Sequence, residues 1–417
     1  MIPPLIYVQI ASYRDPELLF TIRDCLAKAS KPKNLTFGIC WQRDQEETLG
    51  EFAEDSRFRI FEIPFERSRG PCWARSKTQA LFNNEPFTLQ IDSHHRFVEN
   101  WDGILIEMLS SLQTKGHEKP LLSSYAPAYD PLNDPNNRGS QPLRLLFNGF
   151  KPEGPFSICS ESMIEFTTMS EPEPAHFLSA HFIFTIGLFC KEVPYDPSLY
   201  FFGEEPSLAI RAFTNGYDLF HPHKIIIWHH YGRENNPKHW TDHQRWILRN
   251  ERSMIRYRQI ISEGIDPRVS LLGIFGLGTK RTLKDYEYYS GLNFSMTGST
   301  SKALSNLPPH EINSSQTEID FNSHINVSWE IVIDFNNVAY NKDIEKYDFF
   351  YIGAHSQDED ELIRKDLSGA DLKIALKEGK YLLELYSNKI PVTWTVWPYN
   401  KILKWEIKTT RPILHTF

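Results

Sequence analysis

The sequence lacks the long apolar runs and the cysteine patterns that mark several classes of protein. No stretch approaches the roughly 18 consecutive apolar residues of a membrane-spanning helix. The five cysteines are an odd number at wide spacings, and no C-x-x-C pair occurs. This argues against a disulfide framework and a zinc ribbon, and it favours a reducing compartment. We therefore expect no membrane span.

Several sequence signals of function are also missing. The chain has no G-x-G-x-x-G, no Walker A motif, no G-x-S-x-G and no H-E-x-x-H. Its net charge of −8 argues against a general nucleic-acid binder, which needs a basic surface to neutralise phosphates. The first residues, MIPPLIYVQI, show neither the basic region nor the long apolar core of a secretory signal. The expected location is the cytoplasm.

What the sequence does contain is an alternation of strand and helix patterns over its first 130 residues. Apolar runs predict strands at 5–10, 35–41, 58–63, 87–91 and 121–125. Helical spacing predicts helices at 71–82 and 101–112, and another that begins at Pro16 with Asp15 as its N-cap. This rhythm is typical of an α/β fold with a mostly parallel sheet, in which ligands bind beyond the carboxyl ends of the strands.

The later sequence changes character. A long loop region that can include short strands is expected at 126–175, strands at 181–189 and 225–228, and helices at 203–214 and over about twenty residues from Asp242. Near 295–325 the composition shifts to Ser, Thr, Asn and Pro, and the short apolar runs that follow predict strands. We therefore expect an α/β domain at 1–300, a linker at 301–322 and a small all-β accessory domain at 323–417.

A candidate metal site follows the strand at 87–91, where the chain reads Asp92-Ser93-His94. Side chains two residues apart on an extended segment point to the same face. One carboxylate and one imidazole suit Mn²⁺ or a similar divalent ion, which neutralises the charge of a departing diphosphate. A D-x-H tripeptide also arises by chance, and Asp92 could simply cap a turn.

Three other clusters stand where ligands are expected. His229 and His230 follow the strand at 225–228 and offer a third metal ligand, with Arg233 close behind for phosphate. Glu204 and Glu205 begin a helix, where the dipole alone favours carboxylates and where one of them could reach substrate hydroxyls. The remaining candidates could contact a nucleotide or a diphosphate. They follow the first strand or lie in the helix after Gly70: Ala11, Ser12, Arg14 and Arg75.

Taken in order, seven segments resemble the GlcNAc-transferases typified by the cytoplasmic enzymes that modify hydroxyproline on a polypeptide. They are VQIASYRDPEL, FGICWQ, RGPCWAR, LQIDSHHRFVENWD, FFGEEPSLAIRAFTNGYDLFHP, IIIWHHYGR and GLGTKRTLKDYEYYSGLNF, spanning residues 8–294. That family is similar in turn to the polypeptide GalNAc-transferases, which share the GT-A fold and a D-x-H metal site. The chain after about residue 310 has no counterpart in the family.

The resemblance implies a retaining transferase on a GT-A, Rossmann-like catalytic domain, with UDP-GlcNAc as donor and Mn²⁺ or Mg²⁺ as its ion. It places the metal on Asp92, His94 and His229, with His230 as the alternative third ligand. It places Glu204 or Glu205 near the acceptor, and Arg14 and Arg75 near the nucleotide or donor. The acceptor could be a protein or a glycan.

Two other functions remain open from the residues alone. A metal-dependent hydrolase of a nucleotide sugar or phosphoester could use the same ligands, with His95, His230 or Asp242 as additional ones. A non-catalytic nucleotide-sugar-binding protein could share the fold, but it has no need of both an intact D-x-H and an acidic pair.

Overall fold

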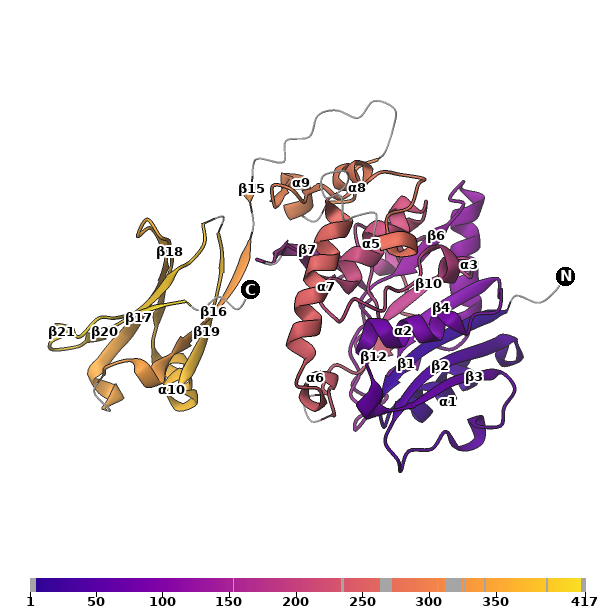
Figure 1. Cartoon of the computed structure of the whole chain (residues 1–417), viewed down its shortest axis with the longest axis horizontal. Helices are drawn as coiled ribbons and strands as arrows, with labels where there is room; N and C mark the ends of the chain where they lie inside the picture. The colour runs from indigo at the N-terminus through magenta and orange to yellow at the C-terminus, as the bar shows by residue number, and fades with distance from the viewer. Residues whose placement is uncertain are drawn as a thin grey trace.

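The computed structural model describes residues 5–152, 154–233, 236–262, 272–305, 307–311, 324–325, 327–340, 343–387 and 389–413. Within these ranges the first part of the chain is built on one large sheet (Figure 1). Its strands run in the order β3-β2-β1-β4-β10-β6-β11-β9. They are β1 (Ile6–Tyr13), β2 (Leu35–Arg43), β3 (Phe58–Pro64), β4 (Phe87–Asp92), β6 (Pro120–Ser123), β9 (Glu173–Pro174), β10 (Phe182–Ile186) and β11 (Asp218–His221).

The sheet is mostly parallel, as predicted. The four strands β3, β2, β1 and β4 are parallel to one another, and β11 is parallel to β6. The strands β10 and β9 run antiparallel to their neighbours. In the register between β1 and β4, Ala11 lies opposite Asp92, so both residues stand at the carboxyl edge of the sheet.

Helices cover both faces of this sheet and bury its apolar side chains. On one face α1 (Leu18–Lys28) and α3 (Trp101–Thr114) contribute Ile22 and Trp101 to a core shared with β1, β2 and β4. On the other, α5 (Glu204–Thr214) and α8 (Leu283–Ser290) pack Leu208 and Tyr286 into a second core. The helix α2 (Pro71–Ala80) starts at the predicted Gly70-Pro71 and packs against β1 and β2.

The structure refines several local predictions. The first helix starts at Leu18 and not at Pro16, and Asp15 does not cap it. Although the oxygen Oδ1 of Asp15 accepts from the Glu17 amide, its Oδ2 is taken by residues 93, 94 and 233. The loop region expected at 126–175 does hold strands, a hairpin of β7 (Leu143–Phe150) and β8 (Phe156–Ser162) with an irregular register near Gly149.

Two further differences concern 225–262. The apolar run at 225–228 yields β12 (Ile227–His229), which pairs with β5 (His95–Phe97) outside the large sheet. The helix expected from Asp242 is present as α7 (Trp246–Ile261), but it begins at Trp246, after the short helix α6 (His239–Asp242). In the described part of the chain, no helix combines the length and apolar character needed to cross a membrane.

The C-terminal part is β-rich, as expected, and lies beside the first part in Figure 1. Its strands are β16 (Ser328–Asp334), β17 (Tyr347–His355), β18 (Glu361–Leu367), β19 (Lys380–Tyr386), β20 (Thr393–Asn400), β21 (Lys404–Trp405) and β22 (Thr409–Pro412). It also holds one helix that the strand patterns concealed, α10 (Gly369–Glu378), which packs Leu372 and Ala375 onto its core. In the predicted linker, residues 301–304 form the short helix α9 (Ser301–Leu304), and 312–323 lie outside the described residues.

Candidate active site

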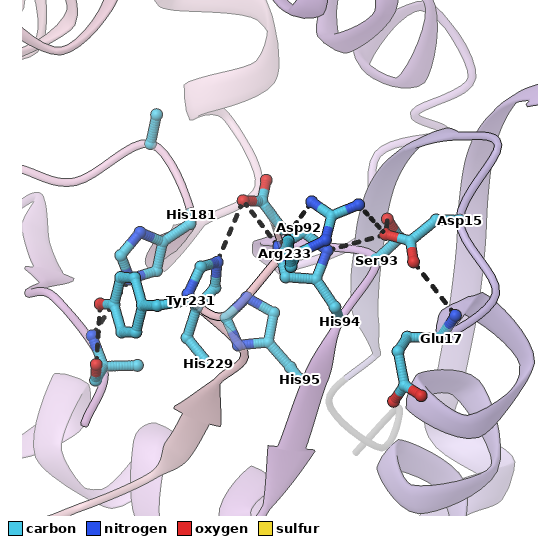
Figure 2. A network of polar contacts seen from close by, with 12 residues as sticks. Asp15, Glu17, Asp92, Ser93, His94, His95, His181, His229, Tyr231 and Arg233 are labelled. Atoms are coloured by element: carbon cyan, nitrogen blue, oxygen red, sulfur yellow. Dashed lines mark hydrogen bonds and ion pairs between the residues drawn. The ribbon is translucent and has the colours of Figure 1, made fainter. Parts of the chain in front are cut away.

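Three side chains from two distant parts of the chain meet at the carboxyl end of β4. The Oδ2 oxygen of Asp92 lies 3.8 Å from Nε2 of His94 and 3.4 Å from Nε2 of His229. One ligand atom from each of the three residues lies within 4.8 Å of the others. Figure 2 shows the two imidazoles turned toward the same carboxylate. We call these three residues the trio.

The pairing of β5 with β12 explains how His229 reaches this place. In that ladder His229 lies opposite His95, and the amide of His230 donates to the carbonyl of His94 at 3.1 Å. The backbone of His229 is fixed on its other side too, because its amide donates to the carbonyl of Pro127 at 3.0 Å. A short strand outside the large sheet thus carries the third side chain to the end of β4.

A buried carboxylate sets the orientation of His94. Nδ1 of His94 lies 2.8 Å from Oδ2 of Asp15, which is itself 5% exposed. Because Asp15 can only accept while ionised, Nδ1 carries the proton and Nε2 is left with a lone pair. Burial opposes the ionised form of Asp15, but His94 and Arg233 hold its pKa below the ordinary value. This is the arrangement of a metal-ligating histidine and its outer carboxylate.

Asp92 is held ionised by its neighbours. Burial alone would raise its pKa, yet Arg75 and the two histidines of the trio hold it well below the usual range. The Nη2 group of Arg75 donates to Asp92 Oδ1 at 2.6 Å, which leaves Oδ2 to face the imidazoles. Burial lowers the pKa of His229 to about 3, so its ring is neutral at physiological pH and can offer a lone pair.

These residues fit a divalent ion. Ligand atoms bound at about 2.1 Å around one ion lie roughly 3 to 3.5 Å apart. The distances of 3.4 and 3.8 Å from Asp92 Oδ2 to the two imidazoles are close to this range, and the three ligand atoms lie within 4.8 Å of one another. One carboxylate and two imidazoles form a donor set suited to Mn²⁺ and similar ions. The outer contact from Asp15 to His94 is also the kind that fixes a ligand's tautomer.

The acidic pair at the start of α5 divides into two different environments. Glu204 is 6% exposed, and its Oε1 lies 3.1 Å from Nε of Arg75, so one arginine links it to Asp92. Glu205 accepts from the Ala180 amide at 2.9 Å and from the Tyr125 hydroxyl at 3.3 Å. Burial raises the pKa of Glu205 to about 7.

A cavity of about 1120 Å³ opens beside the trio. Arg75, Asp92, Glu204 and Glu205 line its inner end. The exposed Phe201 and Phe202, together with side chains of β16 in the C-terminal part, contribute to its outer walls. Its size is at the upper end of the range for small-molecule sites, so it can hold more than one sugar-sized group.

The predicted nucleotide residues are more scattered. Ala11 is next to Asp92 in the sheet register, and the hydroxyl of Ser12 is buried without a hydrogen-bond partner among the described residues. Arg14 points elsewhere, to Asp242 and Asp44 at 2.9 and 3.0 Å. None of Ala11, Ser12 and Arg14 lines the described cavity.

Arg233 does reach the trio. Its guanidinium donates to Nε2 of His94 at 3.2 Å and to Oδ2 of Asp15 at 3.0 Å (Figure 2). The lone pair that accepts this hydrogen bond is the one that an ion would use. Ion binding at His94 and this contact of Arg233 therefore exclude each other.

The spare metal ligands named from the sequence do not complete the trio. The ring of His230 lies tilted against that of Tyr129, with ring centroids 5.8 Å apart, and Asp242 is paired with Arg14. His95 is fully buried behind the trio, where its Nδ1 lies 3.0 Å from the Trp228 carbonyl. The structure thus brings His229, and not His230, to Asp92.

Sequence reasoning missed two residues that support the trio. Asp15 was assigned to a helix cap, and His181 was not singled out at all. The ring of His181 stacks on that of His229 with centroids 4.5 Å apart, and its Nε2 accepts from the Ala126 amide. Nothing in the local sequence around His181 signals this, because the contact depends on the antiparallel placement of β10.

Comparison with solved structures gives distant likenesses only. A structure titled GalNAc-T7 with UDP, GalNAc and Mn²⁺ is 13% identical, covers 68% of this chain and 56% of its own, and has a TM-score of 0.44. The likeness therefore spans little more than half of the GalNAc-T7 chain. Staphylococcus aureus TarS 1–349 in complex with UDP-GlcNAc is 13% identical, with 65% and 70% covered and a TM-score of 0.39. A search of curated proteins gives no significant match.

Comparison with protein families gives a much clearer result. The family described as Glycosyltransferase (GlcNAc) matches residues 5–55 and 49–296. The matched residues make up more than half of the 417-residue chain and contain every residue of the trio as well as the acidic pair. The chain therefore belongs to the GlcNAc glycosyltransferase family.

Proposed function

We propose that this chain moves GlcNAc from UDP-GlcNAc to an acceptor hydroxyl, that it depends on a divalent ion, and that the anomeric configuration is retained. The observation that carries the proposal is the convergence of Asp92, His94 and His229 at the carboxyl end of β4, beside a large cavity. GlcNAc as the sugar and retention follow from the resemblance to the hydroxyproline-modifying GlcNAc-transferases.

In this proposal the trio holds Mn²⁺ or Mg²⁺, and the ion when bound neutralises the developing charge of the diphosphate. Arg233 leaves His94 as the site fills and becomes free to pair with a phosphate oxygen. Ala11, Ser12 and Arg14 line the nucleotide. Arg14 is paired with Asp242, so it must leave that partner in order to contact the donor.

Arg75 links the two carboxylates of the site, Asp92 and Glu204. It holds Asp92 in its ionised state and fixes Glu204, so Glu204 positions other groups and does not reach the reacting atoms itself. Glu205 is the better candidate for direct contact, because its hydrogen bonds come from neutral donors and its pKa of about 7 suits sharing a proton with a substrate hydroxyl.

The acceptor enters from the outer part of the cavity, where the walls come from both parts of the chain. A protein or a glycan is the proposed acceptor class. We also propose the division into a catalytic domain at 1–300, a linker at 301–322 and an accessory domain at 323–417. The five free cysteines, four of them buried, support a cytoplasmic location.

The test is nucleotide release from a panel of UDP- and GDP-sugars, with Mn²⁺ or with EDTA. Many transferases slowly hydrolyse their donor without an acceptor, so the donor can be found first. The expected result is UDP release from UDP-GlcNAc that needs Mn²⁺ and is lost in Asp92→Ala. His230→Ala serves as the matched control, since that imidazole lies outside the trio. Metal-independent release, or release from GDP-sugars alone, would overturn the proposal.

The hydrolase and the binding protein remain as outcomes of the same assay. Rapid UDP-GlcNAc cleavage that no acceptor accelerates identifies a hydrolase. Tight binding of UDP-GlcNAc that Asp92→Ala leaves intact, without turnover, identifies a binding protein. For a transferase, NMR of the glycoside product reads out the anomeric configuration directly, because the new glycosidic bond prevents mutarotation.

A further inference from the structure

A hairpin at the far end of the C-terminal part carries unusually exposed apolar side chains. Residues 400–408 connect β20 through β21 toward β22, and we call them the tip hairpin (Figure 1). Ile402 is 83% exposed, Leu403 72% and Ile407 68%. Exposing apolar side chains to water costs free energy. Three of them within six residues indicate a surface that binds a partner.

The turn of this hairpin is well ordered and its backbone is satisfied from within. The Oδ1 oxygen of Asn400 accepts from the amides of Ile402 and Leu403 at 2.9 and 3.2 Å. Asn400 itself is only 3% exposed, and its Nδ2 donates to Glu406. The two most exposed residues can therefore leave water without orphaning their N–H groups, which an apolar medium would penalise.

Behind the aliphatic turn lies a band of aromatic rings. Trp405 packs on Trp397 and Tyr399, with centroids 4.4 and 4.9 Å apart, and Trp405 remains 39% exposed. The indole nitrogen of Trp397 donates to the carbonyl of Glu406. Tryptophan and tyrosine at this depth behind an aliphatic tip are typical of segments that sit at a membrane–water interface.

Lysines outnumber carboxylates in the tip hairpin. Lys401, Lys404 and Lys408 are all exposed, against a single carboxylate in the segment, although the whole chain carries a net charge of −8. The ammonium groups of Lys401 and Lys404 donate to backbone carbonyls, and that of Lys408 lies over a tryptophan ring. The charge of Lys401 is shared with Glu345, whose pKa Lys373 and then Lys401 lower. Lys404 and Lys408 are therefore the charges most available to an anionic partner.

We propose that the tip hairpin binds the surface of an anionic lipid bilayer, with Ile402 and Leu403 in the headgroup region and the lysines on the lipid phosphates. Apolar burial and attraction to anionic lipid act together in such binding, and neither needs a spanning helix. The acidic remainder of the chain is repelled by the same surface, which orients the tip hairpin toward it. The proposal does not depend on the reaction that the enzyme catalyses.

The test is co-sedimentation of the full chain with vesicles of phosphatidylcholine alone, or with one third phosphatidylglycerol, at low and high salt. Binding is expected to the anionic vesicles at low salt only. The double variant Lys404→Gln, Lys408→Gln removes two positive charges. Each charge removed is expected to weaken binding roughly fivefold. Replacing both Ile402 and Leu403 by Ser should weaken binding to the same vesicles.

The matched control is Leu132→Ser, which removes an even more exposed leucine, 93% exposed, from the first part of the chain and should bind as the native chain does. Unchanged melting temperature and UDP release in solution show that each variant is folded. Absence of binding to the anionic vesicles would overturn the proposal, as would binding that the tip variants leave unchanged. Sedimentation velocity tests for self-association. If the chain is a dimer that the Ile402 and Leu403 substitutions dissociate, and no vesicle binding is seen, the hairpin is a self-association surface and the proposal is wrong.

Discussion

The substitution Asp15→Asn isolates the contribution of the outer carboxylate to metal binding. Asp15 does not point into the trio, yet its Oδ2 accepts from His94 Nδ1 at 2.8 Å, from Ser93 Oγ at 2.5 Å and from Arg233 at 3.0 Å. An asparagine has one acceptor oxygen and no charge, so it can no longer hold the proton on Nδ1 and also bind the arginine. Nε2 of His94 then spends part of its time protonated or turned away from the ion.

The size of the effect follows from this geometry. Removing an outer partner of a metal-ligating histidine weakens metal binding by about 10- to 100-fold. That corresponds to roughly 1.4 to 2.7 kcal/mol. UDP release at limiting Mn²⁺ should fall by the same factor, and saturating Mn²⁺ should restore much of it, because Asp15 is not itself a ligand.

The assay is titration calorimetry with Mn²⁺, paired with UDP release across a Mn²⁺ series. Asp102→Asn is the control, since that carboxylate is also buried but accepts from the amides of Ser30 and Lys31, away from the trio. The control should lose stability without losing Mn²⁺ affinity. If Asp15→Asn binds Mn²⁺ as tightly as the native chain, the reasoning about His94 is wrong.

Three further predictions concern the rest of the site. His229→Ala should abolish Mn²⁺-dependent UDP release while His230→Ala keeps it; the reverse result would move the third ligand. Arg75→Met leaves the buried Glu204 without its cation and removes one partner of Asp92, and it should cost roughly 3 to 5 kcal/mol in urea unfolding; a loss below about 1 kcal/mol would contradict this. Burial raises the pKa of Glu205 to about 7 from 4.5. The folded chain thus binds this proton more tightly, and stability falls as pH rises between those values. Glu205→Gln should add at most about 3 kcal/mol near pH 8 and nothing near pH 4, as pH-dependent denaturation would show.

Much of the fold could be read from the sequence because its signals are local. The strands at β1 to β4 are apolar runs bounded by polar residues, and the Gly70-Pro71 pair marks the start of α2. The helix α10 was missed because its apolar run at 374–376 is as short as the neighbouring strand patterns and lies between them. The run at Ile225–Ile227 reads as a strand, and nothing local shows that its partner is β5.

The candidate site could likewise be predicted in part from the sequence. The residues Asp92 and His94 stand together in the sequence, and the end of a buried strand is a recognisable position for ligands. Asp15 could not be placed, because an aspartate before a proline has the same appearance whether it caps a helix or reaches a histidine 79 residues away. The different environments of Glu204 and Glu205 likewise depend on Arg75 and Ala180, which only the fold brings near them.

The central claim is that Asp92, His94 and His229 hold the ion that binds the donor diphosphate. Crystals grown with Mn²⁺ and UDP-GlcNAc test it most directly, because the anomalous signal of manganese marks the ion without assumptions about the protein. The account predicts one strong manganese peak bonded to Asp92 Oδ2, His94 Nε2 and His229 Nε2, with diphosphate oxygens completing the shell and Arg233 withdrawn from His94. A donor bound without manganese, or a manganese peak on other residues, would contradict it.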